Sequence, residues 1–227
     1  MKNIQPTANL GLREKLATQG TKNLADAELL AVFISSGNRK KSCLQLAYEL
    51  IHQTGDLRGV LNADSQTFLS ISGLGMVRYL QLQAAKEICR RSDFIHLQKT
   101  TQLNNTQDTH AFIKRQLRDK KNETFAVLFM DSQHRVISYE ELFYGTINCA
   151  SIHPRPIVER ALALNAATII VAHNHPSGLS DASLQDRNVT TKLIKAMELV
   201  DVQLLDHLII GDNEIFSILH GVKWTCH

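Results

Sequence analysis

The chain has 227 residues, of which 44% are hydrophobic and 21% charged, as expected for a globular protein of one large or two small domains. It contains no run of about 18 apolar residues, and residues 1–11 lack the hydrophobic core of a secretory signal. This composition argues against a membrane span and predicts a cytoplasmic protein.

The net charge of +3 is unevenly placed. Residues 1–101 hold 13 Lys and Arg against 8 Asp and Glu, a net +5, whereas residues 102–227 hold 12 against 14, a net −2. If the protein meets a polyanion, we therefore expect the first part of the chain to make the contact.

Two helices are predicted near the amino terminus. The first covers residues 23–36, with Asn23 in the capping position and acidic residues in the first turn, where the positive end of a helix favours them. The second covers residues 42–54 and carries an apolar stripe at helical spacing until Gly55 ends it. Both helices have an apolar face to bury, which predicts a helical amino-terminal domain.

Residues 68–78 are similar to a helix-hairpin-helix motif: a short helix, a Gly-Leu-Gly turn, and a longer amphipathic helix that continues to about Arg91. The glycines let the backbone turn tightly and approach a ligand, and the amides that open the second helix can donate to a phosphate. Gly73, Gly75 and Arg78 are therefore the predicted DNA contacts, and they would bind the backbone without reading the bases. Such turns also serve as plain packing elements, and the sequence leaves that alternative open.

Residues 93–105 have mixed polarity and no sustained periodicity, which is typical of a linker. We therefore predict two domains, residues 1–101 and residues 102–227. In the second domain helical and strand patterns alternate, which predicts an α/β fold with a mixed sheet. The predicted elements are a helix at 106–118, strands at 123–130, 135–143 and 147–152, a helix at 157–165 started by Pro154 or Pro156, a strand at 166–171, a helix at 183–200, and strands at 203–210 and 215–219.

The stretch after the strand at 166–171 carries the chemistry. His173 and His175 are two residues apart, so in an extended chain their side chains leave the same face. A short loop follows, and then a helix whose first turn would carry Asp186. Two imidazoles and one carboxylate are zinc-type ligands, and the fourth position stays open, as in a catalytic site. A lone buried histidine is usually a plain core residue, but a pair that ends an apolar strand is less often so.

The spacing His173-x-His175, seven residues, Ser183, two residues, Asp186 matches the JAMM, or MPN-plus, metalloprotease motif at each position. The surrounding sequence segments resemble the bacterial RadC branch of that family (UPF0758-type proteins), and the resemblance covers nearly the whole chain. These segments are Phe143-Tyr144-Gly145-Thr146, His153-Pro154-Arg155, His173-Asn174-His175-Pro176-Ser177-Gly178 and Leu205-Asp206-His207-Leu208-Ile209.

The resemblance implies a JAMM/MPN domain, an α/β sandwich that is cytidine-deaminase-like in outline, with Zn²⁺ held by His173, His175 and Asp186. It also implies a general base at the head of the first central strand, and Glu123 matches that position. Glu140 and Glu141, in the next strand, are the competing choices.

Ser183 resembles the serine with which the family stabilises the oxyanion of the tetrahedral intermediate. Ser183 and Asp186 also fit a variant of the capping box at the start of a helix, and the two roles are compatible. His207 is expected to be structural or to support the ligands. The sequence assigns no role to His153, Arg155 or Asn174.

The implied activity is hydrolysis of a peptide or isopeptide bond by a metal-activated water. The alternative is a DNA-binding protein associated with repair or recombination, in which the metal domain is not proteolytic. The letters His-Asn-His also invite comparison with HNH nucleases, but that class needs its three residues spread over a ββα unit. The sequence therefore favours the hydrolase.

Overall fold

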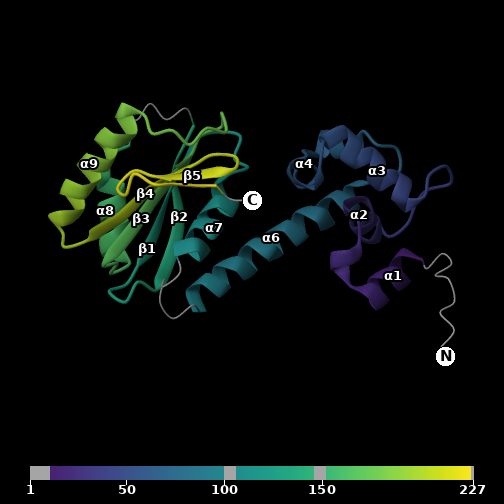
Figure 1. The fold of residues 1–227 in the computed structure, drawn as a ribbon, viewed down its shortest axis with the longest axis horizontal. Helices are drawn as coiled ribbons and strands as arrows, with labels where there is room; N and C mark the ends of the chain where they lie inside the picture. The colour runs from purple at the N-terminus through teal and green to yellow at the C-terminus, as the bar shows by residue number, and fades with distance from the viewer. Residues whose placement is uncertain (1–10, 100–105, 146–151, 226–227) are drawn as a thin grey trace. The chain divides into compact units, whose positions relative to one another are not determined.

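A computed structural model describes residues 11–99, 106–145 and 152–225 of the chain (Figure 1). Packing divides the chain into two compact units, residues 1–89 and residues 90–227. The described part of the first unit is helical and the second unit holds the sheet. The predicted mixed α/β fold with a helical amino-terminal region is therefore confirmed.

The first unit is built around the pair α2 and α3, whose Leu46 and Leu50 are fully buried together with Phe68 from α5. Its helices are α1 (Leu12–Gln19), the 3₁₀ turn η1 (Thr21–Asn23), α2 (Asp26–Ile34), α3 (Cys43–Thr54), α4 (Leu57–Asn62), α5 (Ser65–Leu69) and the first part of α6 (Met76–Lys99). The start of α3 is capped by Ser42, whose hydroxyl accepts from the Gln45 amide at 3.2 Å.

The predicted cap of the first helix is wrong. Asn23 lies in η1, and its side-chain amide donates to the carbonyl of Gln19 at 2.7 Å. Helix α2 begins at Asp26 instead, and Glu28 accepts the amide of Ala25 at 2.9 Å. The acidic first turn was a better guide to the helix start than the asparagine.

The predicted succession of short helix, glycine turn and long helix is present as α5, residues 70–75 and α6. Gly73 has φ +110°, and a Cβ placed on it would lie 2.3 Å from Nδ2 of Asn38, so only glycine fits there. Gly75 accepts the amide of Tyr79 at 3.2 Å as α6 begins, and a Cβ on it would have no atom within 4 Å among the described residues.

Helix α6 continues to Lys99, so residues 93–99, predicted as part of a linker, are helical. Leu97 is buried in a core of the second unit, where Phe94 packs beside it, 5.8 Å from Phe112 between ring centroids. These two apolar residues, three apart, lie on the same face of the helix and hold it against the core. The division by packing at residues 89 and 90 lies inside this helix, upstream of the predicted boundary at residues 101 and 102.

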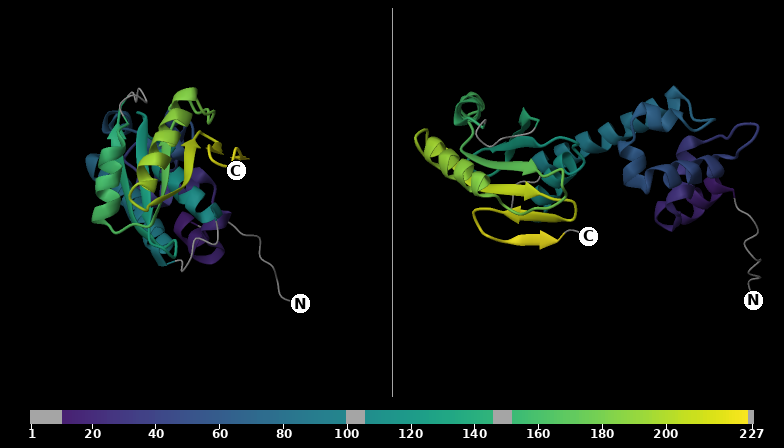
Figure 2. Two further views of the ribbon diagram at one scale, coloured as in Figure 1. Left: turned by 90° about the vertical axis from the view of Figure 1, so that its left-hand side faces the viewer. Right: turned by 90° about the horizontal axis from the view of Figure 1, so that it is seen from above.

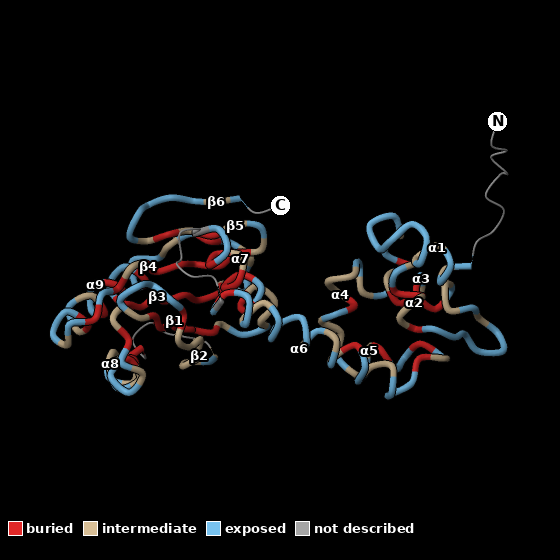
Figure 3. Tube along the Cα trace, turned by 90° about the horizontal axis from the view of Figure 1, so that it is seen from below, coloured by how far each residue is buried: buried red, intermediate tan, exposed pale blue. Residues whose placement is uncertain are grey.

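Within the described residues of the second unit, six strands form one sheet in the order β2–β1–β3–β4–β5–β6. The strands are β1 (Thr124–Met130), β2 (Val136–Tyr144), β3 (Thr168–Asn174), β4 (Gln203–Ile210), β5 (Glu214–Ser217) and β6 (Lys223–Thr225). β1 and β3 pair antiparallel and β3 and β4 pair parallel. Every residue of β1 and β3 is buried, as their continuous apolar runs predict (Figure 3).

Helices cover both faces of this sheet (Figure 2). On one face, α7 (Thr106–Leu117) packs Phe112 and Leu117 against the even-numbered residues of β1 and β3. On the other face, α8 (Pro154–Ala163) and α9 (Leu184–Glu198) pack against their odd-numbered residues. The alternation of side chains along each strand thus supplies two separate cores.

The strands differ from the predicted ones at β3 and at β6. The strand predicted at 166–171 is β3, which continues to Asn174, so His173 is itself a strand residue. The strand predicted at 147–152 falls mostly on residues outside the described ranges. Strand β6 was not predicted; it pairs with β5 at the edge of the sheet. None of the helices in the described part of the chain is long and apolar enough to cross a membrane.

Candidate metal centre

Two histidines leave the end of β3 on the side of the sheet that α9 covers. His173 lies in register with Phe125 of β1 and Ile209 of β4. His175 prolongs the pairing by one residue, since its amide donates to the carbonyl of Ile210 at 3.0 Å. Because side chains alternate along an extended chain, both imidazoles share one side and Asn174 takes the other.

These imidazoles meet a carboxylate from α9. The Nε2 atoms of His173 and His175 are 3.0 Å apart, and Asp186 places Oδ1 3.3 Å from the first and Oδ2 4.0 Å from the second. A tetrahedral zinc-type site with bonds of about 2.0–2.1 Å has ligand atoms about 3.3 Å apart. The three observed separations bracket that value, so the residues present fit a metal ion.

Glu123, which directly precedes β1, belongs to the same group. Its carboxylate and one ring nitrogen each from His173 and His175 all lie within 4.8 Å of one another. Burial lowers the pKa of His175 and the charge of His173 lowers it further, while the charges of Asp186 and Glu123 act in the opposite direction. The described residues therefore offer two overlapping ligand sets, in which Asp186 or Glu123 is the third member.

The competing glutamates of β2 are held in ion pairs. Glu140 accepts two hydrogen bonds from Arg160, at 2.8 and 2.6 Å, and these hold its pKa below the ordinary value. Glu141 accepts from the ammonium of Lys120 at 2.7 Å. Neither belongs to the group of metal-type ligands found among the described residues.

Ser183 and Asp186 form the capping box at the start of α9. The Ser183 hydroxyl accepts the Asp186 amide at 3.1 Å and donates to Asp186 Oδ2 at 2.6 Å, and the Ser183 amide donates to the same oxygen at 2.8 Å. Burial raises the pKa of Asp186, but the adjoining His173 ring and the hydrogen bonds from Ser183 outweigh it and hold that pKa far below its usual range. Asp186 is thus a fixed, buried carboxylate, whereas the oxyanion role of Ser183 stays a prediction.

The loop after β3 fixes the orientation of the second imidazole. His175 Nδ1 lies 3.0 Å from the carbonyl oxygen of Leu179. A carbonyl only accepts, so Nδ1 carries the hydrogen and Nε2 presents its lone pair toward His173 and Asp186. Gly178, with φ +81°, shapes this loop, and its carbonyl accepts the amide of Asp212 at 2.9 Å.

Asn174, between the two histidines, fastens the segment that carries Glu123. Its Oδ1 accepts the amide of Thr124 at 2.8 Å, and its amide donates to the carbonyls of Lys120 and Asn122 at 3.2 and 3.3 Å. The ladder between β1 and β3 ends at the pair of Phe125 and His173. The Asn174 side chain therefore continues the pairing beyond the last strand pair and holds the backbone on both sides of Glu123.

His207, on β4, lies directly behind His173. Its Nε2 is 2.9 Å from His173 Nδ1, and its Nδ1 is 2.7 Å from the hydroxyl of Thr190 on α9. Burial lowers the pKa of His207 well below its ordinary value, and the charge of His173 lowers it further. His207 is accordingly a neutral, fully enclosed group in contact with the site.

Two comparisons with known families cover most of the chain. Residues 103–223 match the RadC-like JAB domain, and residues 8–80 match the UPF0758 N-terminal family. The chain is 67% identical to a UPF0758 protein of Legionella pneumophila subsp. pneumophila (strain Philadelphia 1) over 96% of both chains. It is 49% identical to a UPF0758 protein of Halorhodospira halophila, over 91% of this chain and 92% of that one, and 45% identical to one of Pseudoalteromonas atlantica, over 96% and 97%. The chain belongs to the RadC family.

The RadC-like JAB domain contains all the residues of the candidate metal centre. A JAB domain that holds a group able to bind a metal indicates a metal-dependent, hydrolase-like domain. The names of these relatives state no activity.

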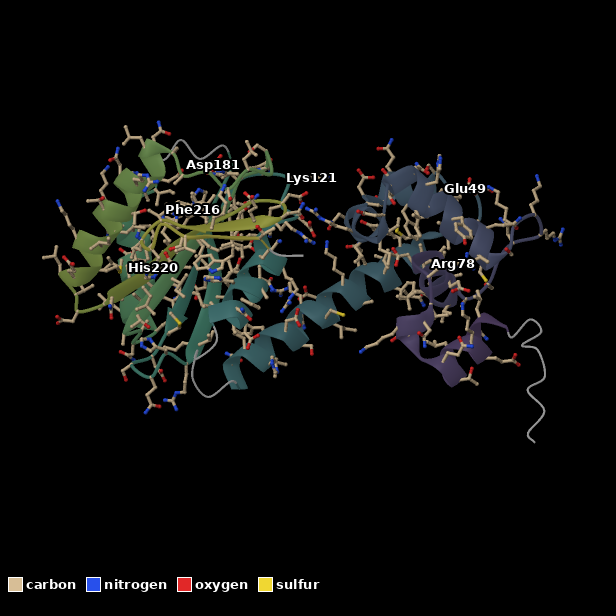
Figure 4. The ribbon with its side chains drawn as sticks, in the orientation of Figure 1. Glu49, Arg78, Lys121, Asp181, Phe216 and His220 are labelled. Carbon is tan, nitrogen blue, oxygen red and sulfur yellow. The ribbon has the colours of Figure 1, made fainter. Side chains whose placement is uncertain are left out.

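The UPF0758 N-terminal region contains Gly73, Gly75 and Arg78, which belong to the first unit. Arg78, labelled in Figure 4, donates to the carbonyl of Gly73 and to the carbonyl and hydroxyl of Ser36, the last two at 2.7 and 2.8 Å. Its guanidinium thus ties the glycine turn to the end of α2, a packing role that the sequence did not indicate. Binding of DNA by these residues stays a prediction.

Two residues of the JAB domain with no assigned role lie at the start of α8. His153 is exposed and flanks the first turn, and Arg155 pairs with Glu159 at 2.7 Å. Sequence reasoning missed the roles of Asn174 and Thr190. The strand alternation that pairs His173 with His175 also turns Asn174 to the opposite side, and this is the only local signal for it.

Proposed function

We propose that this RadC family chain is a zinc-dependent hydrolase of an amide bond, with Zn²⁺ held by His173, His175 and Asp186. One observation carries the proposal: the ligand atoms of these residues lie 3.0 to 4.0 Å apart, with Glu123 beside them. Two imidazole nitrogens and one carboxylate oxygen are a common ligand set of catalytic zinc.

Asp186 is the better third ligand of the two candidates. It is only 3% exposed, and the capping box fixes its carboxylate while hydrogen bonds keep it ionised. Glu123 precedes β1 at the edge of the same group, where a carboxylate can reach a water beside the ligands. In this division of roles, Asp186 binds the metal and Glu123 transfers the proton.

A zinc ion bound here would supply Lewis acidity, which polarises a carbonyl group and lowers the pKa of water. Glu123 takes the proton of the attacking water and delivers it to the leaving amine. The hydroxyl of Ser183, after turning from Asp186, donates to the oxygen on which negative charge develops. His173, His175 and Asp186 keep their places throughout, because backbone pairing and the capping box hold them.

The substrate class is a peptide or isopeptide bond, which is what the resemblance to JAMM metalloproteases implies. The site's composition supports amide hydrolysis, since it pairs a base with a hydroxyl donor next to the ligands.

The test is metal analysis of the purified full chain together with cleavage of an isopeptide-linked and a linear peptide library. Asp186→Ala should lose bound zinc and activity, whereas Glu123→Gln should retain zinc and lose activity at least 100-fold. Glu159→Gln, which removes an exposed carboxylate on α8, is the control and should change neither. Zinc retained by Asp186→Ala but lost by Glu123→Gln would assign the third ligand to Glu123 and overturn this division of roles.

The second candidate function, DNA binding by the amino-terminal unit, is favoured by one observation. Gly75 leaves open space at the start of α6, where helix amides can face a phosphate. Gly75→Glu is the cleaner probe because a Cβ at Gly75 has no described atom within 4 Å, whereas one at Gly73 would clash with Asn38. It should weaken duplex binding several-fold and reduce the salt dependence, whereas Gln66→Glu, with a similar added charge on α5, should have little effect. Equal binding by both variants would remove the turn from consideration.

A further inference from the structure

A chain of hydrogen bonds runs from the first proposed ligand through three elements and back to the third. It starts at His173 Nδ1 on β3, passes to His207 Nε2 at 2.9 Å, and leaves β4 from His207 Nδ1 to the Thr190 hydroxyl at 2.7 Å. The hydroxyl lies 2.7 Å from the backbone carbonyl of Asp186, on the same helix. All four residues are at most 4% exposed.

The direction of each bond follows from the last acceptor. A carbonyl oxygen can only accept, so the single hydrogen of the Thr190 hydroxyl points to Asp186. The hydroxyl must then accept from His207, which places the hydrogen of that ring on Nδ1. A neutral imidazole has one N–H, so His207 Nε2 accepts, and the hydrogen between the two rings sits on His173 Nδ1.

The reverse direction leaves a contact unsatisfied. If Thr190 donated to His207, its oxygen would face the Asp186 carbonyl at 2.7 Å with no hydrogen between them. Two buried oxygens at that separation repel each other, so this direction is disfavoured. Only one orientation satisfies all three contacts.

We propose that Thr190 and His207 are positioning residues that keep the hydrogen of His173 on Nδ1, so that Nε2 is the atom turned to His175 and Asp186. The proposal deepens the proposed function, because it states how one ligand is kept ready for the metal. His175 achieves the same end by a direct bond from Nδ1 to the carbonyl of Leu179. For His173, whose Nδ1 faces β4, an imidazole and a hydroxyl replace the carbonyl.

This arrangement also ties the ligands to one another. His173 and Asp186 meet at 3.3 Å on the side of the metal-type ligands, and the chain through His207 and Thr190 joins them on the far side. A shift of α9 against the sheet would therefore disturb the orientation of His173 as well as the place of Asp186. Supporting hydrogen bonds of this kind typically contribute 10- to 100-fold to metal affinity.

The experiment compares Thr190→Val with Thr190→Ser in the full chain. Valine matches threonine in shape but lacks the hydroxyl, whereas serine retains it. The first readout is ¹⁵N NMR of the metal-free protein, with ring-labelled histidine assigned by His173→Gln and His207→Gln spectra. The second is zinc affinity, measured by competition with a chelator at fixed pH.

In the parent chain and in Thr190→Ser, His173 should show a protonated Nδ1 and His207 a protonated Nδ1 with a bare Nε2. Thr190→Val should shift His207 toward the other tautomer and weaken zinc binding about 10-fold or more. Unfolding by denaturant shows whether each variant is folded. A Thr190→Val protein with unchanged ring signals and unchanged zinc affinity would overturn the proposal.

The proposed function and the positioning role can fail separately. If the parent chain bound no zinc, the proposed function would fall, yet the ring signals of the metal-free protein would still decide the role of Thr190. If zinc bound and Glu123→Gln abolished cleavage while the His173 hydrogen sat on Nε2, the proposed function would stand and the positioning role would be refuted.

Discussion

Replacing Asn174 by alanine should loosen the segment that carries Glu123 while leaving the metal ligands in place. The Asn174 side chain makes its three hydrogen bonds to Lys120, Asn122 and Thr124, all in the segment before and at the start of β1. It points to the side of the sheet opposite the two histidines. The substitution therefore separates support of the proposed base from support of the metal.

The expected loss of stability in Asn174→Ala follows from the backbone groups that would lose their hydrogen-bond partner. The Thr124 amide is buried, with the residue 2% exposed, and Asn174 is itself 1% exposed. A buried N–H without a partner costs about 1–3 kcal/mol, and the two carbonyls lose bonds with a net worth of about 0.5–1.5 kcal/mol each. Since the carbonyls lie near the surface and water can replace part of their bonding, we expect a loss of about 2–3 kcal/mol.

The assay is denaturant unfolding of Asn174→Ala beside Asn213→Ala. Asn213 is exposed in the turn between β4 and β5, so its removal should change stability by about 0.5 kcal/mol or less. Zinc affinity of Asn174→Ala should stay within about threefold of the parent chain, because no ligand bond is removed. Equal stability of the two variants would show that the Asn174 bonds contribute nothing and would refute the reasoning.

Two further predictions concern the ligands. Ser183→Ala removes the cap of α9 and the hydroxyl bond to Asp186, so the free energy of unfolding should fall by about 1 kcal/mol; Thr191→Ala, which removes an exposed hydroxyl from the same helix, should cost less, and no difference between them would contradict the capping role. Burial lowers the pKa values of His175 and His207 in the folded metal-free protein, so the unfolded chain binds more protons below about pH 6.5. Stability of the metal-free protein should therefore be full above that pH and decrease as the pH falls below it, as measured by unfolding at several pH values; a flat profile would contradict the burial of these rings.

The elements of the second unit were predictable where periodicity and burial agree. The continuous apolar runs of β1 and β3 are buried on both faces. Such runs are typical of central strands that are covered on both sides of a sheet. The pairing of His173 with His175 follows from strand alternation alone, and Ser183 with Asp186 from the spacing of a capping box. These are local relations, so the sequence expresses them directly.

The misplaced features depend on contacts that local patterns do not report. Residues 93–99 were predicted to be part of a linker because their polarity is mixed and shows no sustained periodicity, but Phe94 and Leu97 pack into the core with Phe112 of α7 and the helix continues through them. Strand β6 has three residues and exists by pairing with β5. The packing partners of Arg78, Ser36 and Gly73, become visible only when α2 and the glycine turn are packed together, while its predicted DNA contact stays a prediction.

The hydrogen bonds that support the candidate site also depend on contacts between residues far apart in the sequence. Asn174 reaches residues about fifty positions earlier in the chain, and His173 reaches His207 across the parallel pair of β3 and β4. A motif search finds the ligands because they are close in sequence, but their hydrogen-bond partners are set by the order of strands in the sheet. Asp206 and His207 belong to one of the segments that resemble the family, and the register of His207 with Val171 places its ring behind the site.

The two supports act on different parts of the chemistry, because Asn174 and the supported His173 leave β3 on opposite sides. Asn174 holds the segment before β1, and with it the proposed base, whereas His207 and Thr190 hold His173 against α9. Asn174→Ala should therefore impair proton transfer more than zinc binding, and Thr190→Val should impair zinc binding first. Neighbouring residues on a strand face opposite sides, so an asparagine between the two proposed ligand histidines can support the proposed base without contacting the proposed metal.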